Sequence, residues 1–283
     1  MSIKSDLKEY AKSIGIPLLG VASVDRFENI SYGLKPDVLL PGAKAVIAFG
    51  IPDLKGTMAG FYQAEKTGNE PVRAIYGKYG RGSTNAVTLM YATWALGQWI
   101  ETKHNKIAVP TMTGPWSISR TLSHRHAAVA AGLGEMGYQN AVITPEYGPR
   151  VRWGAIVTTL DIEADPLYDG PKLCDPEKCG YACVKKCTND AISEEKSEEL
   201  KIGEKTYKIA TVNFNHCRTE CMGISDKVDP NATAREVQDA VNKIPYEPGR
   251  MFRADTYLCD RCIGFCPAGK DYEYYKKAGW VDK

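Results

Sequence analysis

The sequence predicts a fold that mixes helices and strands, in which a cysteine-free scaffold is followed by a metal-binding module. Two observations support this prediction. All nine cysteines lie from Cys174 onward, so the first 173 residues contain none. The first part also alternates apolar strands with helical segments, whereas the part after Cys174 has little regular patterning apart from its cysteines. We therefore expect one domain over residues 1–170 and a second over residues 171–283.

The first half of the scaffold shows clear strand and helix signals. Apolar spacing from Leu7 to Ile14 predicts an N-terminal helix rather than a signal peptide. The segments LLGVASV (18–24) and AVIAFGI (45–51) predict two buried strands. Ser83 or Thr84 would then cap a helix that runs to Ile100.

The second half of the scaffold continues the alternation. The segment KIAVP (106–110) predicts another strand, and the alanine-rich segment 124–134 favours a helix that ends at Gly132 or Gly134. Residues 140–162 alternate around a turn at 146–149, which is typical of a β-hairpin. Farther on, the charged segment 193–208 predicts a solvated excursion between two groups of cysteines.

Charge and hydropathy exclude some classes of function. The 36 basic and 34 acidic side chains leave a formal charge of +2, which lacks the basic footprint that phosphate backbones attract, so we expect no nucleic-acid partner. The longest largely uncharged helical stretch, residues 85–100, is too short to span a bilayer, so we expect no membrane segment. Nine cysteines without an export signal argue for metal or redox chemistry in the cytoplasm rather than for disulfides.

The cysteines form two runs of the kind that holds iron–sulfur clusters. Near the end, Cys259-x2-Cys262-x3-Cys266-Pro267 matches the last three positions of the C-x2-C-x2-C-x3-C-P run of two-cluster ferredoxins. In that run the cysteine before proline binds the other cluster. Residues 174–187 supply a looser run, C-x4-C-x3-C-x3-C, with Thr188 in place of the proline.

Two [4Fe–4S] clusters need eight thiolates, and the crossover rule divides the cysteines into two sets. One set is Cys174, Cys179, Cys183 and Cys266, and the other is Cys187, Cys259, Cys262 and one of the pair Cys217 and Cys221. We select Cys217 and leave Cys221 as the spare, although the sequence does not separate the two. Structural zinc would need paired C-x2-C or H-x3-H motifs, and only one C-x2-C exists here; free buried thiols are the other alternative.

A glycine motif in the middle of the chain imitates a dinucleotide fingerprint. Residues 132–137, GLGEMG, satisfy G-x-G-x-x-G by letter. That fingerprint needs a strand before it and a helix after it, whereas here a helix precedes and an extended segment follows. The motif therefore predicts a tight helix-to-strand turn.

Three linked segments give the chain a family resemblance. They are HAAVAAGLGEMG (126–137), ITPEYGPRVR (143–152) and VTTLDIEADP (157–166). Together they resemble the cofactor-binding core of reductive dehalogenases, and they are similar more distantly to epoxyqueuosine reductases. In both groups this core precedes two cysteine runs, and the second has the form seen here at YLCDRCIGFCP (257–267). The resemblance covers roughly residues 85–270.

The resemblance implies a fold and cofactors. It implies an α+β architecture: a nitroreductase-like cofactor-binding domain that holds cobalamin, followed by a ferredoxin-like domain that carries two [4Fe–4S] clusters. The residues that would contact the corrinoid are those of the glycine turn, its neighbour Arg125 and the following loop: Arg125, Gly132, Leu133, Gly134, Met136, Gly137, Thr144, Tyr147 and Gly148.

The resemblance also implies catalytic residues. Tyr91 matches the tyrosine that donates a proton above the cobalt in dehalogenases, and Arg150 or Arg152 would be the cation that lowers its pKa. The alternative is that Tyr91 is an ordinary helix-core residue, because its spacing from Val87 and Trp94 is typical of one helix face.

The implied function is a reductase. Electrons from a low-potential donor such as ferredoxin or flavodoxin would pass through the clusters to cobalt, for reductive cleavage of a small-molecule substrate. Epoxyqueuosine reductases place an aspartate before the alanine-rich helix and a tRNA-binding extension after the clusters. Residues 116–125, WSISRTLSHR, contain no acid, and only seventeen residues follow Cys266, so we expect no action on tRNA. Two alternatives remain open, a non-catalytic electron-transfer protein and a flavin-binding scaffold, and the sequence leaves the oligomeric state open.

Overall fold

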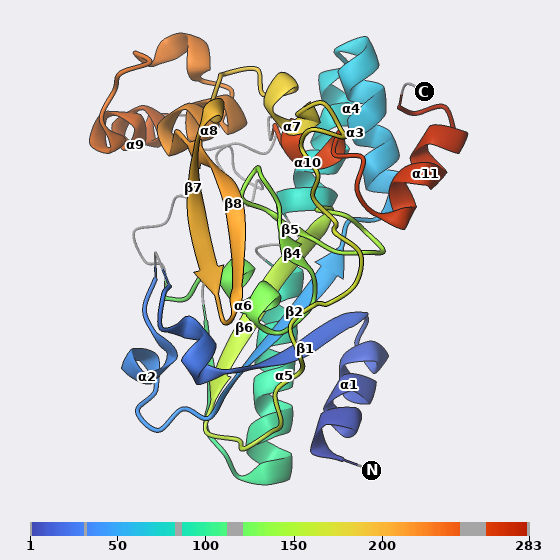
Figure 1. The fold of residues 1–283 in the computed structure, drawn as a ribbon. Coiled ribbons are helices and arrows are strands. Elements are labelled where there is room, and N and C mark those ends of the chain that lie inside the picture. The colour runs from blue at the N-terminus through green and yellow to red at the C-terminus, as the bar shows by residue number, and fades with distance from the viewer. Residues whose placement is uncertain (1, 31–32, 83–86, 112–120, 244–258, 282–283) are drawn as a thin grey trace.

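A four-stranded antiparallel sheet forms the centre of the molecule (Figure 1). The computed structural model describes residues 2–30, 33–82, 87–111, 121–243 and 259–281. The strand order is β1 (Leu18–Ser23), β2 (Ala45–Pro52), β6 (Val151–Thr158) and β3 (Ala108–Pro110). The strands predicted at 18–24, 45–51 and 106–110 are thereby confirmed. Every residue of β6 is buried, because layers of structure cover both faces of the sheet.

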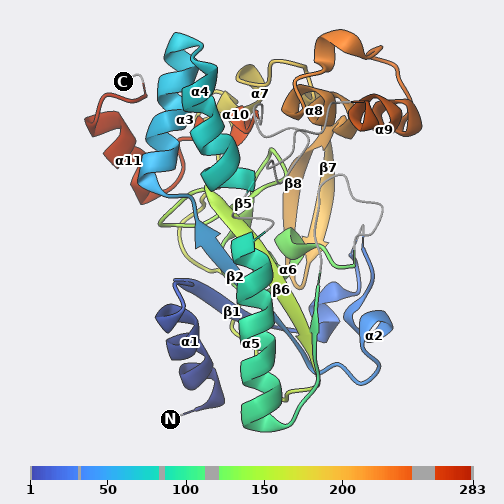
Figure 2. The ribbon, with the colours of Figure 1, turned by 180° about the vertical axis from the view of Figure 1, so that it is seen from behind.

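Helices cover one face of the sheet, and a helix with a β-ribbon covers the other. The first layer contains α1 (Ile3–Ser13) and α5 (Leu89–His104), whose apolar side chains meet Ile47 and Ile156 of the sheet (Figure 2). On the opposite face lies α6 (His124–Ala130), the predicted alanine-rich helix, together with the hairpin of β7 (Ile192–Ile202) and β8 (Lys205–Val212). The predicted helix caps at 83 and 84 lie outside the described residues.

The hairpin predicted over residues 140–162 is wrong. β5 (Val142–Ile143) pairs with β4 (Glu135–Met136), while β6 pairs with β2 and β3. Only an isolated bridge between Thr144 and Gly148 closes the turn between them. A strand that is buried along its whole length must pair its backbone groups along both edges. It can do so between two neighbours in a sheet but not in a two-stranded hairpin, and this explains the difference.

The charged segment 193–208 is also not the solvated excursion that its composition predicts. It forms most of the β7–β8 hairpin, and one face of that hairpin enters the core through Leu200, Ile202, Tyr207 and Ile209. The alternation Leu-Lys-Ile and Tyr-Lys-Ile on either side of Gly203, which has φ 57°, was the available signal.

Most of the remaining helices gather at one end of the sheet, whereas α2 lies near the other (Figure 1). In chain order the remaining elements are η1 (Val24–Phe27), α2 (Pro36–Leu39), α3 (Lys55–Thr67), α4 (Glu70–Ile75), the π-helix η2 (Tyr76–Gly82), α7 (Ala182–Lys185), α8 (Phe214–Cys221), η4 (Ser225–Lys227), α9 (Ala234–Asn242), α10 (Arg261–Gly264) and α11 (Lys270–Lys277). α10 lies against α3 and α7, so the two cysteine runs meet beside the scaffold. None of the described helices has the length and apolarity needed to cross a membrane.

Candidate functional site

The two cysteine runs fold into similar local structures. Tyr181 and Asp260 both adopt a left-handed backbone conformation, with φ 55° and 46°, and each precedes a one-turn helix, α7 or α10. Two residues beyond each lies a cysteine, Cys183 or Cys262, and four residues farther on lies another. Figure 1 shows α7 and α10 side by side, and the two helices are in contact. The runs are therefore a structural repeat, although their spacings differ.

The first set of thiols lies against the glycine turn. The Tyr138 N–H donates to Cys174 Sγ at 3.2 Å. Burial raises the pKa of Cys174 to about 11, and the thiols of Cys266 and Cys179 add to the shift. Burial likewise raises the pKa of Cys183 to about 12, with Cys266, Cys174 and Cys179 as its thiol neighbours. These four side chains, which come from both runs, therefore form one group.

The second set lies beside it. Burial raises the pKa of Cys262 well above its usual value, and the thiols of Cys259, Cys187 and Cys221 contribute after Asp260. Burial also raises the pKa of Cys259 to about 12, and Cys221 is the largest charge influence on it. The Ala191 N–H donates to Cys187 Sγ at 3.2 Å.

The structure brings Cys221 to this second set, whereas our sequence-based choice was Cys217. Cys221 ends α8 and is 2% exposed, and Cys217 lies one helical turn earlier and is half-buried. The two positions share a helix face, so the sequence pattern carried no information about which of them points at Cys259.

The two groups of thiols do not form a site for a single metal ion. Within the described residues, no three His, Cys, Asp or Glu side chains are placed to hold a single metal ion. A cubane cluster makes a different demand, because each of its four thiolates binds a separate iron. Crowded, buried thiols with raised pKa values are poorly placed to ionise without a metal, and metal binding displaces their protons.

Arg150, predicted as a catalytic cation, lies in a buried network of hydrogen bonds. Its guanidinium is fully buried and donates to both carboxylate oxygens of Asp271, at 2.7 and 2.6 Å. It also donates to the backbone carbonyls of Cys266 at 2.9 Å and Ala268 at 2.5 Å. These contacts fasten the second cysteine run to the scaffold, and the catalytic role of Arg150 stays a prediction.

Arg152, the other predicted cation, lies in a second buried network, and its catalytic role also stays a prediction. Its guanidinium binds both oxygens of Asp53, at 3.1 and 2.8 Å, and one oxygen of Asp260 at 3.1 Å. It also donates to the Tyr76 hydroxyl at 2.6 Å, and that hydroxyl donates in turn to Asp260 at 2.9 Å. Burial raises the pKa of Asp53 even though Arg152 opposes the shift. This buried network joins β2, η2 and β6 to the residue that follows Cys259.

Tyr91 lies away from both arginine networks. It is 59% exposed on α5, and its ring meets that of Trp94 at 6.1 Å, which is itself 60% exposed. Met90 beside them is 67% exposed. The alternative of an ordinary core residue is therefore wrong, and the role of Tyr91 as a proton donor stays a prediction.

Close packing within the chain explains the glycines of the turn. A Cβ at Gly132, Gly134 or Gly148 would lie 2.0–2.1 Å from a backbone carbonyl oxygen, that of Pro166, Ile143 or Ala268 respectively. Gly132 and Gly148 also have positive φ, 74° and 52°. A cofactor is not needed to account for glycine at these positions.

The other predicted cofactor contacts of this region are largely buried by the protein itself. Met136 belongs to the core, and Leu133 and Tyr147 pack against it. Gly137 lies against the Ile143 side chain. Thr144 is fully buried, and its hydroxyl accepts from the Tyr147 N–H at 3.0 Å and donates to the Gly148 carbonyl at 3.2 Å. These contacts stabilise the turn.

The polar end of the same turn carries groups that the sequence pattern did not single out. The Arg125 guanidinium donates to the Asn140 carbonyl, and Asn140 has φ 60°. The buried Asn140 Oδ1 finds no hydrogen-bond partner among the described residues. The neighbouring Gln139 side chain lies near the Cys266 thiol and opposes the burial that raises the pKa of Cys266. The sequence signal for these groups was Asn140, three residues after the glycine motif, because Asn is a residue type that adopts the left-handed conformation.

Comparison with known proteins gives consistent relatives. No family model matches the chain. Epoxyqueuosine reductase of Bacillus cereus is 26% identical over 96% of this chain and 66% of its own length, and that of Bacillus subtilis is 27% identical over 64% and 50%. Tetrachloroethene reductive dehalogenase of Sulfurospirillum multivorans is 37% identical over 24% of this chain and 13% of its own. The chain thus spans half to about two thirds of the length of the epoxyqueuosine reductases.

Solved structures share the fold. Epoxyqueuosine reductase from Streptococcus thermophilus has a TM-score of 0.56 at 20% identity, covering 94% of this chain and 66% of that one. A reductive dehalogenase studied for B12-dependent dehalogenation has a TM-score of 0.57 at 14% identity, covering 96% and 33%. An epoxyqueuosine reductase solved with a tRNA stem loop has a TM-score of 0.53 at 18% identity, covering 94% and 64%.

That last structure bears on the reasoning behind the expectation of no nucleic-acid partner, which for this chain stays a prediction. A protein with this fold is solved together with a tRNA stem loop. A formal charge of +2 for a whole chain therefore does not exclude nucleic acid, because a local surface can be basic while distant acids cancel its charge.

Proposed function

Because the chain belongs to the superfamily of epoxyqueuosine reductases and reductive dehalogenases, we propose that it is a corrinoid-dependent iron–sulfur reductase. Electrons pass through two [4Fe–4S] clusters to a corrinoid bound on the scaffold. The first cluster is held by Cys174, Cys179, Cys183 and Cys266. The second is held by Cys187, Cys221, Cys259 and Cys262, with Cys217 as the ninth cysteine.

The crossover of the cysteine runs carries this proposal. Cys266, from the second run, lies with the thiols of the first, and Cys187, from the first run, lies with those of the second. This exchange is the arrangement of two-cluster ferredoxins, and it has no function in a zinc site or among free thiols. It requires the two runs to be neighbours, and the contact between α7 and α10 meets that requirement.

The surroundings of the thiols suit iron–sulfur clusters. The N–H groups of Tyr138 and Ala191 donate to Cys174 and Cys187. Such bonds stabilise the more reduced, more negative cluster and so raise its potential. Tyr138, Cys183, Ile192 and Ala210 form a small apolar cluster around which Cys174, Cys187 and Cys262 pack. That shell limits the access of water to both sets.

The end of the glycine turn fits one part of a corrinoid. Corrin side chains are amides, and an unpartnered, buried acceptor such as Asn140 Oδ1 suits an amide N–H. The Arg125 guanidinium fixes the Asn140 backbone, and Gln139 contacts Cys266, so this end of the turn joins the scaffold to the first set of thiols. When bound, the corrinoid supplies a strongly reducing cobalt centre. The role of the chain is to hold it, to orient it and to deliver electrons.

The relatives favour epoxyqueuosine in tRNA as the substrate over a small halogenated molecule. Several epoxyqueuosine reductases match more than half of this chain, whereas the dehalogenase matches about a quarter of it. In the family, a carboxylic acid before the alanine-rich helix donates the proton, and residues 116–125 contain no acid. If this substrate is correct, another group of the chain must supply the proton, and the exposed Tyr91 hydroxyl is the candidate we propose.

Anaerobic reconstitution tests the proposal. Protein incubated with iron, sulfide and hydroxocobalamin, then desalted, should retain about eight irons and one cobalt per chain. It should also convert an epoxyqueuosine-containing tRNA stem loop under a chemical reductant. Two clusters without retained cobalt would favour the non-catalytic electron-transfer alternative, and flavin retained instead of corrin would favour a flavoprotein. Asn140→Leu should reduce cobalt retention and leave the iron content unchanged.

Turnover of an aryl halide but not of the stem loop would contradict the proposed substrate, while the proposed reductase activity would stand. Tyr91→Phe provides the catalytic test, because it removes only the hydroxyl. It should lower the rate of conversion by about 10²-fold or more while cobalt and iron content stay at the unaltered level. An unchanged rate would remove Tyr91 as the proton donor.

A further inference from the structure

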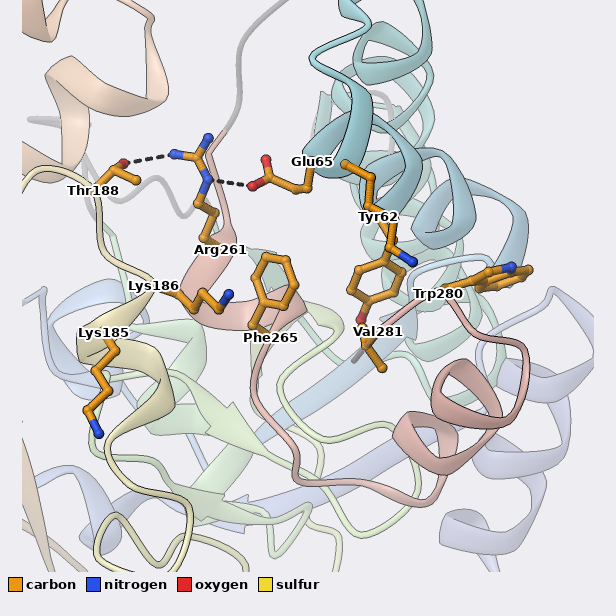
Figure 3. A pocket seen from close by; sticks show the side chains of 10 residues that line it. Tyr62, Glu65, Lys185, Lys186, Thr188, Arg261, Phe265, Trp280 and Val281 are labelled. Atoms are coloured by element: carbon orange, nitrogen blue, oxygen red, sulfur yellow. Dashed lines mark hydrogen bonds and ion pairs between the residues drawn. The ribbon is translucent and has the colours of Figure 1, made fainter. Parts of the chain in front are cut away.

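A surface cavity lies over the chain segments that carry both cysteine runs. It has a volume of about 360 Å³. Its walls come from α3, from the end of α7, from α10 and from the segment after α11, as Figure 3 shows. The aromatic rings of Tyr62, Phe265 and Trp280 line it together with the charged side chains of Glu65, Lys66, Lys185, Lys186 and Arg261.

The cavity is tied to the proposed cluster ligands by the chain itself. Lys186 and Thr188 line it, and Cys187 lies between them. Arg261 precedes Cys262, and Phe265 precedes Cys266. Consecutive Cα atoms are about 3.8 Å apart, so ligands of both proposed clusters lie within one residue of the cavity wall. Cys187 is itself only partly buried.

The charge of this surface is predominantly positive. Four cations line the cavity, and Glu65 is the single acid among its lining residues. Arg261 is paired with Glu65 and Glu220, so the net positive charge comes from the three lysines. The Glu65 carboxylate is already bound by Arg261 at 2.7 Å and by Arg73 at 2.7 Å, so its charge is neutralised within the protein. Lys186 extends over the Phe265 ring, 4.5 Å from its centroid. Lys185 is exposed at the rim, and its side chain points away from the Phe265 ring (Figure 3).

We propose that this basic, aromatic surface, defined by Lys66, Lys185, Lys186, Phe265 and Trp280, is where an acidic one-electron carrier protein docks and reduces the clusters. The inference rests on the proposed iron–sulfur function and adds the place at which electrons reach it. The carrier is a small acidic iron–sulfur protein of the ferredoxin class. Opposite charges steer its approach, and the apolar faces of Phe265 and Trp280 allow a short-lived, close contact.

The transfer step needs no other reactant. The reduced carrier gives up one electron and is oxidised, and one [4Fe–4S]²⁺ cluster accepts that electron and becomes [4Fe–4S]⁺. No bond is made or broken, and no proton is required. A cavity that opens on the ligand-bearing loops serves this step, because it brings the carrier close to the cluster without exposing the cluster to bulk solvent.

The placement favours a protein carrier over RNA. A phosphate backbone needs a track of cations along its length, whereas the cations here surround one hollow that contains three aromatic rings. Arg261 is held rigidly by Glu65, Thr188 and Glu220 and supports the wall. The exposed positive charges, in contrast, are those of the two lysines at the end of α7.

Stopped-flow reduction of the reconstituted protein tests the proposal. The double variant Lys185→Glu, Lys186→Glu should be reduced by a pre-reduced acidic [2Fe–2S] ferredoxin about tenfold more slowly, or slower still, at low ionic strength. Added salt should slow the reduction of the unaltered protein by ferredoxin, and so reduce the difference in rate between that protein and the variant. Dithionite, which does not need the docking surface, should reduce both proteins at similar rates. The matched control is Lys103→Glu, Lys106→Glu, a pair of exposed lysines at the far end of α5, which should behave as the unaltered protein does.

Equal rates with ferredoxin for the variant and the unaltered protein would overturn the docking site. If the variant instead loses affinity for a tRNA stem loop while ferredoxin reduces it normally, the surface serves RNA and the proposal is wrong. A failure of dithionite to reduce any cluster in the unaltered protein would count against the iron–sulfur function itself, so the two failures are distinguishable.

Discussion

The two cysteine runs share a local fold but are attached to the scaffold by different forces. The second run, around α10, is fastened by buried charge: Arg152 binds Asp260, and Arg150 binds the carbonyl of Cys266 and the carboxylate of Asp271. The first run, around α7, is attached chiefly by the Tyr138 N–H bond to Cys174, by the Leu173 N–H bond to the Glu135 carboxylate at 2.7 Å and by the apolar cluster around Tyr138.

This difference separates two mechanical roles. A run held by fully partnered buried ions has one geometry, because removing any partner leaves an uncompensated charge. A run held by apolar contacts and single hydrogen bonds has smaller barriers to local opening. The second run is therefore the fixed half of the site, and we expect the first run to respond first to perturbation.

Serine substitutions in α8 give the largest expected effect and test the ligand set of the second cluster. Cys221→Ser should remove that cluster, lowering bound iron by about half, because its thiol reaches Cys259. Cys217→Ser, four residues earlier on the same helix, is the matched control and should keep both clusters. Iron analysis and electron paramagnetic resonance of the reduced proteins measure this. If Cys217→Ser loses a cluster and Cys221→Ser keeps both, Cys217 is the ligand.

The buried arginine of the second run gives the next largest effect. Arg150→Met leaves Asp271 without its partner, and breaking a buried pair costs about 3–5 kcal/mol of the free energy of unfolding. Anaerobic urea denaturation of the reconstituted protein measures the loss. A double-mutant cycle with Asp271→Asn should give a large coupling, whereas additive losses would mean that the ion pair does not fasten the run.

Acidification should act on the scaffold beside the first run. His124 of α6 is held between Thr111 and the Trp153 carbonyl at 2.8 Å each, and burial lowers its pKa to about 4. The unfolded chain, with a histidine pKa of about 6.5, takes up this proton first as pH falls. Stability is therefore lost between about pH 6.5 and pH 4, by up to about 3 kcal/mol.

The variant His124→Gln isolates this effect, because its side chain does not titrate. Its free energy of unfolding should change less steeply over the same pH interval than that of the unaltered protein. Hydrogen exchange should show the Tyr138 turn opening before the segment around Arg150, since Arg125 of α6 holds that turn through Asn140. Parallel curves for the two proteins would show that His124 does not control acid stability.

The sequence predicted the local features well. Alternating apolar residues located the three central strands, and the ferredoxin-like spacing predicted the grouping that brings Cys266 to the thiols of the first run. These signals are short-range or depend on a known repeat. That the grouped thiols bind clusters stays a prediction.

The sequence could not predict which residues pair with the buried charges. Arg150 and Arg152 are two residues apart on β6, but their carboxylate partners Asp53, Asp260 and Asp271 lie 99 to 121 residues away. Nothing in the local pattern of an arginine distinguishes a buried ion pair from a catalytic cation. The choice between Cys217 and Cys221 was open for a similar reason, because it depends on how α8 is placed in the fold, and it stays a prediction.

Removal of one hydroxyl gives the smallest expected effect and probes the anchor of the first run. The Tyr138 hydroxyl donates to the carbonyls of Ser193 at 3.2 Å and Glu194 at 3.0 Å, at the start of β7. Tyr138→Phe keeps the ring in its apolar cluster and keeps the N–H bond to Cys174, so it should cost about 1 kcal/mol. The same denaturation experiment measures it beside Arg150→Met. A loss for Tyr138→Phe as large as that for Arg150→Met would mean that the first run is fixed as firmly as the second, and the proposed division between them would not hold.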